Sequence, residues 1–406
     1  MSFQQGLSGL DAASQNLDTI GNNVANVATV GFKEARAEFA DIYASSFGTS
    51  NGAQVGIGVQ VAAVATQFTQ GNTSTTGNPL DVAINGQGFF RMVNNGNVTY
   101  SRAGEFQLDK NGYVVDSSGN NLTGYPASST GVISPSTPVA MQISTANVAP
   151  TATSTASLAV NLDSLDTVPT PAFSISDSTS YNSSTAMTIY DSQGNAHTLS
   201  TYYVKSAANH WNVYAASDGT LLNGGASVGS LAFGTGGTLA SDTTMNLSVP
   251  LTNGAATPMT FPLTFPAATN SQFGVAFSVN SNTQNGYTTG QLSGYSIGDD
   301  GTLEGRYSNG QTKAMGQIAL GNFINPQGLS ALGNNQFAET AASGQPIVGA
   351  PTTGNLGTLQ SGAVESSNVD LTTELVNMIT AQRNYQANAQ TIKTEDTIQQ
   401  TLVSLQ

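Results

Sequence analysis

The chain has 406 residues, of which only 8% are charged and 44 are glycine. Because 38% are hydrophobic, including 13 Tyr and 16 Phe, the composition excludes a disordered chain and indicates a loop-rich β protein. The net charge of −14 argues against nucleic acid and anionic membranes as partners. Since there is no cysteine, disulfides, thiolate metal sites and cysteine nucleophiles are excluded.

The N-terminal segment carries apolar residues at a spacing of seven, which predicts an apolar stripe on an α-helix. Gly21 and the two asparagines after it are poor helix formers, so we expect the helix to end by about residue 30. No apolar run of signal-peptide length precedes Lys33, the first basic residue, so we expect any export to leave the N-terminus uncut. No run is long enough to span a bilayer, and membrane insertion is not expected. The residues of the stripe are Phe3, Leu7, Leu10, Leu17 and Val24.

The C-terminal segment shows a second stripe, and Asp370 or Asn368 is placed to serve as its N-cap. Its polar face carries amides instead of Lys–Glu pairs, and an uncharged face is suited to packing against copies of itself. A hairpin of two helices inside one molecule explains the periodicity equally well, so both interpretations stay open. The residues of this stripe are Leu371, Leu375, Met378, Tyr385, Ile392 and Leu402.

Between the two ends, turn residues separate short strands. We expect strands over 105–108 and 113–115, and a hairpin over 187–204 folded at 191–195. After a Ser/Thr/Pro-rich boundary, an acidic segment follows with Lys205 as its only base. This segment is interpreted as a domain inserted into a loop of another β domain.

No constellation of residues predicts catalysis, a metal or a cofactor. His197 and His210 stand apart from other ligands, and His197 is expected to face solvent on a strand. Gly86 and Gly88 lack the third glycine of a dinucleotide loop and precede Phe89, which indicates a tight bend before a buried strand. We therefore expect a protein that is not an enzyme.

Five segments resemble, in order, the signatures of the bacterial flagellar rod and hook protein family. The sequences are Asn-Asn-Val-Ala-Asn-Val-Ala-Thr-Val-Gly-Phe-Lys at 22–33, Ile-Asn-Gly-Gln-Gly-Phe-Phe at 84–90, Tyr-Ser-Arg-Ala-Gly at 100–104, Gly-Asn-Phe-Ile-Asn-Pro-Gln-Gly-Leu at 321–329, and Glu-Leu-Val-Asn-Met-Ile to Ala-Asn-Ala at 374–389. The family-motif residues singled out within them are Asn26, Gly31, Phe32, Lys33, Gly86, Gly88, Phe89, Ala387 and Asn388.

Within the family, the acidic insert favours the hook branch, because residues 190–199 resemble the outer domain of hook subunits. The resemblance implies a structural subunit that self-assembles into the hook, the flexible curved tube that transmits motor torque from rod to filament. The two stripes would then form the assembly interface. A distal rod subunit is the alternative, and a secreted β-rich adhesin is a more distant one.

The resemblance also implies an architecture, a location and partners. The expected fold is mainly β, with helical termini that pair as a coiled coil and two β-rich domains, the outer inserted into the inner. The expected location is extracellular, in the hook. The implied partners are other copies in a helical homopolymer, the rod, hook-cap and hook–filament junction proteins, and the flagellar type III export machinery. The expected domains are a terminal helical domain (1–30 and 368–406), a connecting region (31–71 and 359–367), a discontinuous inner β domain (72–146 and 290–358) and an inserted outer β domain (147–289).

Overall fold

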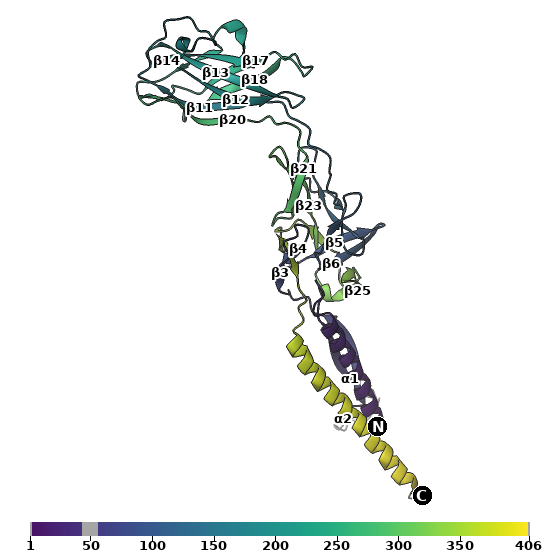
Figure 1. Cartoon of the computed structure of the whole chain (residues 1–406). Helices are drawn as coiled ribbons and strands as arrows, with labels where there is room; N and C mark the ends of the chain where they lie inside the picture. Colours follow the sequence, from purple (N-terminus) through teal and green to yellow (C-terminus); the bar gives the residue numbers. More distant parts are fainter. Residues whose placement is uncertain (1, 43–55, 405–406) are drawn as a thin grey trace. The chain divides into compact units, whose positions relative to one another are not determined.

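The computed structural model describes residues 2–42 and 56–404 and is mainly β, with a helix at each end (Figure 1). This confirms the predicted fold class. The chain forms two compact units. Unit 1 comprises Met1–Thr145, Gly294–Arg306 and Thr312–Gln406, and unit 2 comprises Ala146–Ser293 and Tyr307–Gln311. The finer division of unit 1 into three domains stays a prediction.

The two terminal helices of unit 1 are α1 (Ser2–Ala25) and α2 (Leu371–Ser404). Helix α1 continues through Gly21 and ends at Ala25, where turns replace the remainder of the expected helical segment. The Asp370 carboxylate accepts hydrogen bonds from the backbone N–H groups of Thr372 (2.8 Å) and Thr373 (3.1 Å). Asp370 is therefore the N-cap of α2, as one of the two predicted positions.

The helices run antiparallel and meet along a seam of small and amide side chains. A Cβ added to Gly6 would lie 3.1 Å from Ile392, and one added to Gly9 would lie 2.9 Å from the Asn388 amide. Near the other end of the seam, Asn23 Nδ2 donates to Glu374 Oε2 at 3.4 Å. Glycines let two helices approach closely, because the interaxial distance depends on the side chains at the contact.

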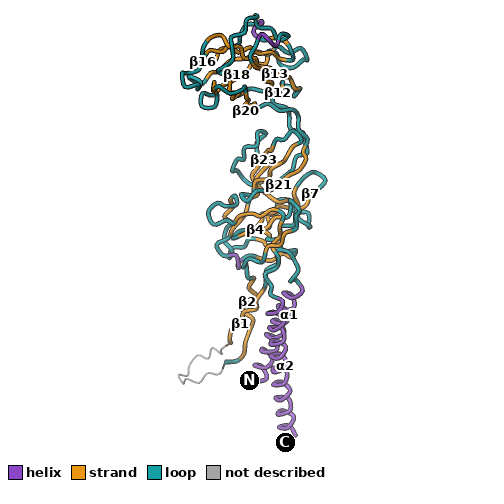
Figure 2. Tube along the Cα trace, turned by 60° about the vertical axis from the view of Figure 1, so that its left-hand side comes forward, coloured by secondary structure: helices purple, strands orange, loops and turns teal. Residues whose placement is uncertain are grey.

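A β-hairpin packs beside the helices (Figure 2). It is formed by β1 (Ala35–Ile42) and β2 (Gly58–Thr66). Asn23 fixes it to α1, since its side chain donates to Ala35 O (2.8 Å) and accepts from Ala35 N (2.9 Å).

The rest of unit 1 is built around a 13-stranded sheet with the main path β21-β22-β23-β9-β5-β6-β26-β25. One face carries a cluster of edge-to-face aromatic rings that includes Phe68, Phe89 and Phe337. Strands β7 and β8 are shorter than predicted, because Glu105 and Tyr113 form only isolated bridges, with Asp81 and Gln142 respectively. Two further sheets have two strands each, β28 with β4 and β29 with β3. The strands of these three sheets are β3 (Thr73–Thr75), β4 (Val82–Asn85), β5 (Phe89–Asn94), β6 (Asn97–Ser101), β7 (Gln107–Leu108), β8 (Val114–Val115), β9 (Asn121–Pro126), β10 (Val139–Ala140), β21 (Leu292–Ile297), β22 (Thr302–Tyr307), β23 (Thr312–Ile318), β24 (Leu320–Asn322), β25 (Ser330–Gly333), β26 (Gln336–Ala338), β27 (Ile347–Gly349), β28 (Thr358–Ser361) and β29 (Ala363–Glu365).

Unit 2 consists of two five-stranded sheets that share one hydrophobic core, in which Tyr203, Trp211 and Phe265 are fully buried. The predicted hairpin is confirmed, because β12 and β13 pair around a turn in which Asp191 Oδ1 accepts from the backbone N–H groups of Gln193 and Asn195. The strands are β11 (Ala156–Asp163), β12 (Ser183–Tyr190), β13 (Ala196–Ala207), β14 (His210–Ser217), β15 (Thr220–Leu221), β16 (Gly229–Ala232), β17 (Thr243–Val249), β18 (Met259–Phe265), β19 (Ser271–Phe273) and β20 (Ser278–Gln284).

Candidate functional site

The described part of the chain shows no metal-binding cluster and no membrane-spanning helix. Across residues 2–42 and 56–404, no group of three or more His, Cys, Asp or Glu side chains is arranged to hold a metal ion. None of the helices in these ranges has the length and apolarity needed to cross a membrane. The features that remain are the surface of the terminal helices and the junction that joins them to the β-sheet.

Except for Ile392, which lies against Gly6 in the seam, the large apolar residues of the two predicted stripes lie beside the seam between α1 and α2 rather than at its centre. The centre is occupied by Ala13, Ile20 and Ala381, which are 8%, 6% and 2% exposed. In contrast, Phe3, Leu7, Leu371, Leu375 and Tyr385 are 37–45% exposed, and Leu10, Leu17, Val24, Met378 and Ile392 are half-buried. The side chain of Leu402 lies outside the described residues.

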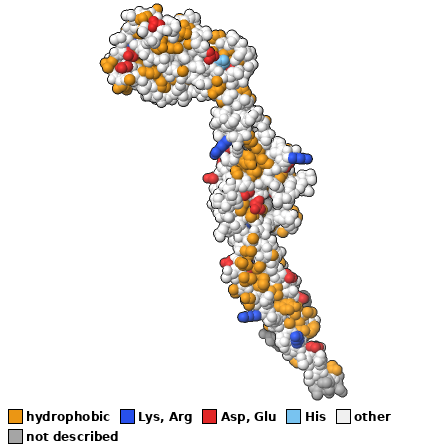
Figure 3. Space-filling model, viewed as in Figure 1, with side chains coloured by type: hydrophobic (Ala, Val, Ile, Leu, Met, Phe, Trp, Pro, Cys, Tyr) orange, Lys and Arg blue, Asp and Glu red, His pale blue; other side chains and the backbone are white. Residues whose placement is uncertain are grey.

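Two exposed apolar residues of α2 do not belong to the stripe predicted from the sequence. Val376 and Ile379 are 58% and 52% exposed and lie one turn apart next to Leu375. Their positions one and four residues after Leu375 are the feature of the sequence that could have identified them. Figure 3 shows apolar side chains on the surface of the part that carries the terminal helices. Exposed apolar patches of this kind mark protein–protein contact sites.

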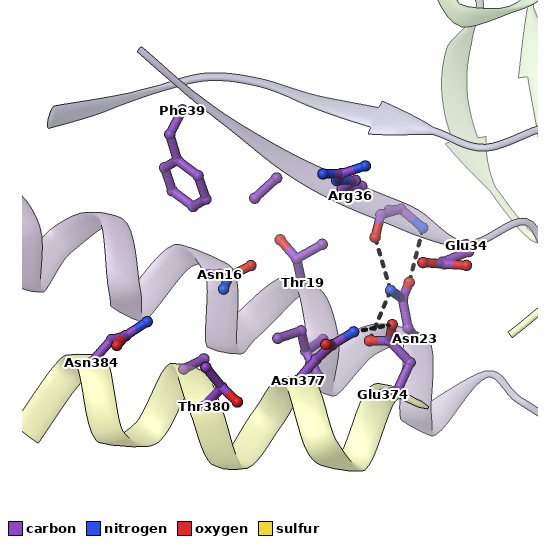
Figure 4. Close-up of a pocket in the computed structure, with 14 residues that line it drawn as sticks. Asn16, Thr19, Asn23, Glu34, Arg36, Phe39, Glu374, Asn377, Thr380 and Asn384 are labelled. Atoms are coloured by element: carbon purple, nitrogen blue, oxygen red, sulfur yellow. Dashed lines mark hydrogen bonds between the residues drawn. The ribbon is translucent and has the colours of Figure 1, made fainter. Parts of the chain in front are cut away.

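A groove follows the seam where α1, α2 and β1 meet (Figure 4). It consists of two adjoining hollows of about 420 and 460 Å³, and Asn16, Phe39, Ala381 and Asn384 line both. In Figure 4, amide side chains from α1 and α2 project into this space below β1. The groove offers amide donors and acceptors from both helices.

The junction between the helices and the sheet is built on one buried carboxylate, Glu365 in β29. Glu365 Oε1 accepts from Lys33 Nζ (2.6 Å) and from the backbone N–H of Gly71 (2.8 Å). Its Oε2 accepts from Arg102 Nη1 at 3.2 Å. All three charged side chains are at most 4% exposed. Burial lowers the pKa of Lys33 and of Arg102, and the Glu365 charge counteracts this effect in each.

Gly31 brings the chain that leaves α1 against the sheet at this junction. Its φ is +71°, and an added Cβ would collide with the backbone of Ala103. Its N–H donates to the Glu365 carbonyl oxygen at 2.8 Å. Upstream, Asn26 Oδ1 accepts from Thr29 Oγ1 at 3.1 Å, which stabilises the turn. Phe32 is half-buried. The sequence identified this motif, but nothing in the sequence indicated that Glu365 is its partner.

Gly86 and Gly88 form the predicted bend before a buried strand. Their φ angles are +113° and +119°, which glycine alone adopts readily. The Gly86 carbonyl accepts from Arg102 Nη2 at 2.9 Å, and the Arg102 guanidinium lies 5.3 Å from the ring centroid of Phe89. These motif residues therefore support the junction. The remaining two family-motif residues lie in α2, where Ala387 is exposed and Asn388 is half-buried against Gly9.

In unit 2, His197 does not face solvent, which corrects the expectation from the sequence. Its ring nitrogens lie 2.7 Å from Asp218 Oδ2 and 3.3 Å from Asp191 Oδ2. Burial opposes the charged form of His197, but the hydrogen bonds and charges of the two carboxylates outweigh it and raise its pKa. Although Asp191 is buried, hydrogen bonds from Asn195 and Asn253 hold its pKa well below the usual range.

Four family models match the chain. They are the flagella basal body rod protein (residues 3–33), the flagellar hook protein FlgE/F/G D1 domain (83–161), the flagellar basal body protein FlaE D2 domain (161–287) and the flagellar basal body rod FlgEFG protein C-terminal model (360–405).

Curated relatives match over the full length of both chains. The chain is 48% identical to the flagellar hook protein FlgE of Salmonella typhimurium and 47% identical to that of Escherichia coli, with 100% of each chain covered. It is 33% identical to the hook protein FlgE of Borreliella burgdorferi, covering 99% of that protein. Among solved structures, the Helicobacter pylori hook protein FlgE2 shares the fold, with a TM-score of 0.53 at 14% identity over 72% of this chain and 100% of the other.

Proposed function

Because the chain belongs to the flagellar hook protein family and is a structural subunit of the hook, not an enzyme, we propose that its terminal helices join one subunit to the next. The family implies self-polymerisation and a location in the flagellar hook, outside the cell. The full-length similarity to hook proteins disfavours the distal rod subunit, and the adhesin interpretation is set aside with it.

The observation that carries this proposal is the exposure of large apolar residues on helices that already have a packing partner. Within one molecule, α1 and α2 meet through Gly6, Gly9 and Ala13 and leave Leu375, Val376 and Ile379 in solvent. At about 25 cal/mol per Å² of apolar surface removed from water, burying such side chains against a neighbouring helix favours association. Contacts between two different surfaces that do not close into a ring produce a helical tube.

Polymerisation of a charged variant tests the proposal. We expect Leu375→Asp to abolish tube formation, because it places a carboxylate in an apolar contact between helices. Leu17→Asp on α1 is expected to have the same effect. Thr373→Asp is the matched control, since Thr373 is exposed on the same helix and the added charge is the same. Electron microscopy of purified chains mixed with short tube seeds gives the readout. Normal tubes from Leu375→Asp, with unit 2 folded as judged by Trp211 fluorescence, would contradict the role of the helices.

The identity of partners other than a second copy is inferred from the family alone. We propose that the helical termini also meet the rod, hook-cap and hook–filament junction proteins, and that the flagellar type III machinery exports the chain. What supports this is the shared rod-protein signature at residues 3–33 and 360–405. Pull-down of each candidate partner with the Leu375→Asp chain, which is expected to stay monomeric, separates these contacts from self-polymerisation.

A further inference from the structure

The few charges on the terminal helices are segregated by sign. Helix α1 contains Asp11 and Asp18 and no basic residue. Both are exposed, and their spacing of seven places them on one face of the helix with exposed Gln4, Gln15 and Asn22. This face lies opposite the one that meets α2, which is formed by Gly6, Gly9, Ala13, Ile20 and Asn23.

Helix α2 shows the opposite sign on its own outward face. Arg383 and Lys393 are exposed there, in line with the exposed apolar residues Val376 and Ile379. The acidic residues of α2 lie elsewhere: Glu374 is 3% exposed in the seam, and Glu395 is half-buried. Asp396 lies to one side of the outward face, where it accepts from the Gln400 amide at 3.0 Å.

These charges have no partner of opposite sign within the described part of one molecule. Asp11, Asp18, Arg383 and Lys393 take part in none of the ion pairs described, which are those of Lys33, Arg102 and His197. The reason is geometric. The contacts Gly9–Asn388 and Asn23–Glu374 set the register of the helices, and this register places Arg383 at a level between Asp11 and Asp18. Arg383 is therefore level with the acidic groups but on the opposite side of the helix pair, whereas Lys393 lies near the level of Gln4, beyond Asp11.

We infer that the acidic stripe of α1, defined as Asp11 and Asp18, docks against the basic stripe of α2, defined as Arg383 and Lys393, in a second copy of this chain. A lateral neighbour brings the outward face of its α2 against the outward face of α1, where Arg383 is level with the acidic stripe and Lys393 extends the basic stripe beyond Asp11. The same contact repeats from copy to copy, because each molecule carries both stripes. This inference rests on the proposed function and adds a rule for alignment: charge complementarity sets the partner's orientation, while the apolar residues drive association.

A charge swap tests the inference with the full-length chain. One variant carries Asp11→Lys and Asp18→Lys, and a second carries Arg383→Glu and Lys393→Glu. At low salt, we expect each variant alone to leave about fivefold more unpolymerised subunit at steady state than the parent chain, as like charges then face each other. An equimolar mixture of the two variants should polymerise like the parent, because each supplies the stripe that the other needs. At ~1 M salt, where the Debye length is about 3 Å, the differences should shrink.

Asp299→Lys with Glu304→Lys is the matched control for the variant that carries Asp11→Lys and Asp18→Lys, since Asp299 is exposed in the turn before β22, Glu304 is exposed on β22, and the change in net charge is the same. Parent-like polymerisation of either swapped variant alone, or a mixture that polymerises no better than its components, would overturn the inference. Either result leaves the proposed function intact if Leu375→Asp still blocks assembly. Trp211 fluorescence and far-ultraviolet circular dichroism confirm that each variant is folded.

Discussion

Lys33 Nζ lies 2.6 Å from Glu365 Oε1, and both side chains are fully buried. This contact connects the residues that follow α1 with the strand that precedes α2, although 332 positions separate the two in the chain. Arg102, which follows β6 of the 13-stranded sheet, shares the same carboxylate. The segment that follows α1, the strand that precedes α2 and the residue after β6 thus meet at one carboxylate.

Removing the charge of Glu365 should destabilise unit 1. In Glu365→Gln, Lys33 and Arg102 stay buried without a counter-charge, and breaking a buried ion pair in this way costs about 3–5 kcal/mol. Urea unfolding followed by far-ultraviolet circular dichroism measures the loss. The chain contains one tryptophan, Trp211, in the core of unit 2. Its fluorescence transition should not move, which provides an internal control.

Glu38→Gln is the matched variant, because Glu38 is exposed on β1 and loses the same charge. We expect its unfolding to follow that of the parent. If Glu365→Gln unfolds at the same urea concentration as the parent, the buried pair is not what holds the junction together.

Gly31 should not accept a side chain. Its φ of +71° strains any other residue, and an added Cβ collides with the Ala103 backbone. We expect Gly31→Ala to lower the free energy of unfolding of unit 1 by ~2–3 kcal/mol, from backbone strain and the clash together. Gly96→Ala is the control, because Gly96 has a φ of +87° but an added Cβ meets nothing within 4 Å. The conformational cost alone should be about 1 kcal/mol there. Equal losses in the two variants would show that the contact with Ala103 is unimportant.

The two terminal helices could be predicted from the sequence, whereas the faces through which they pack could not. The spacing of Leu and Val is the strongest periodic signal, and it identified the two stripes to which Leu17 and Leu375 belong. The seam within the molecule depends instead on Gly6 and Gly9, which contribute no hydrophobic signal and act only by allowing close approach. The fold class followed from composition and turn residues, because short strands between such turns leave few alternatives.

The junction was predictable only in part. Gly31 and Lys33 belong to a recognisable motif, but the Glu365 that they contact lies in an ordinary short strand, and pairing across 332 positions leaves no local pattern. His197 was misplaced for a similar reason. Its partner Asp218 comes from a different turn, and only the pairing of β13 with β14 brings the two together.

The stability of unit 2 should depend on pH through His197. Its pKa is raised in the folded state by the carboxylates of Asp218 and Asp191, despite burial. A raised pKa means that the folded state binds the proton more tightly, so this stabilisation is fully present below the unfolded pKa of about 6.5. It is lost as pH rises through the folded pKa. Between about pH 5.5 and 8.5, where the carboxylates stay ionised, Trp211 fluorescence in urea should show decreasing stability.

His197→Gln should remove most of this slope, because the variant has no group that titrates at that position. His210→Gln is the control, since the His210 side chain is exposed at the start of β14. An unchanged slope in His197→Gln would assign the pH dependence to other groups.

Deleting residues 147–289 should change the shape of the assembled tube without preventing its assembly. The ends of this segment are adjacent, because Val148 and Gly290 exchange backbone hydrogen bonds of 2.8 and 3.1 Å, so the cut ends can be joined by a short glycine linker. The helices and the Glu365 junction stay intact, and we therefore expect tubes to form. The deleted segment presents weakly charged surfaces that we expect to make shallow, replaceable contacts with neighbours. Electron microscopy should show altered curvature and bending stiffness.

Tubes with the parent's curvature and stiffness would exclude a role of unit 2 in bending, whereas a loss of all tubes would show that the helices do not suffice for assembly.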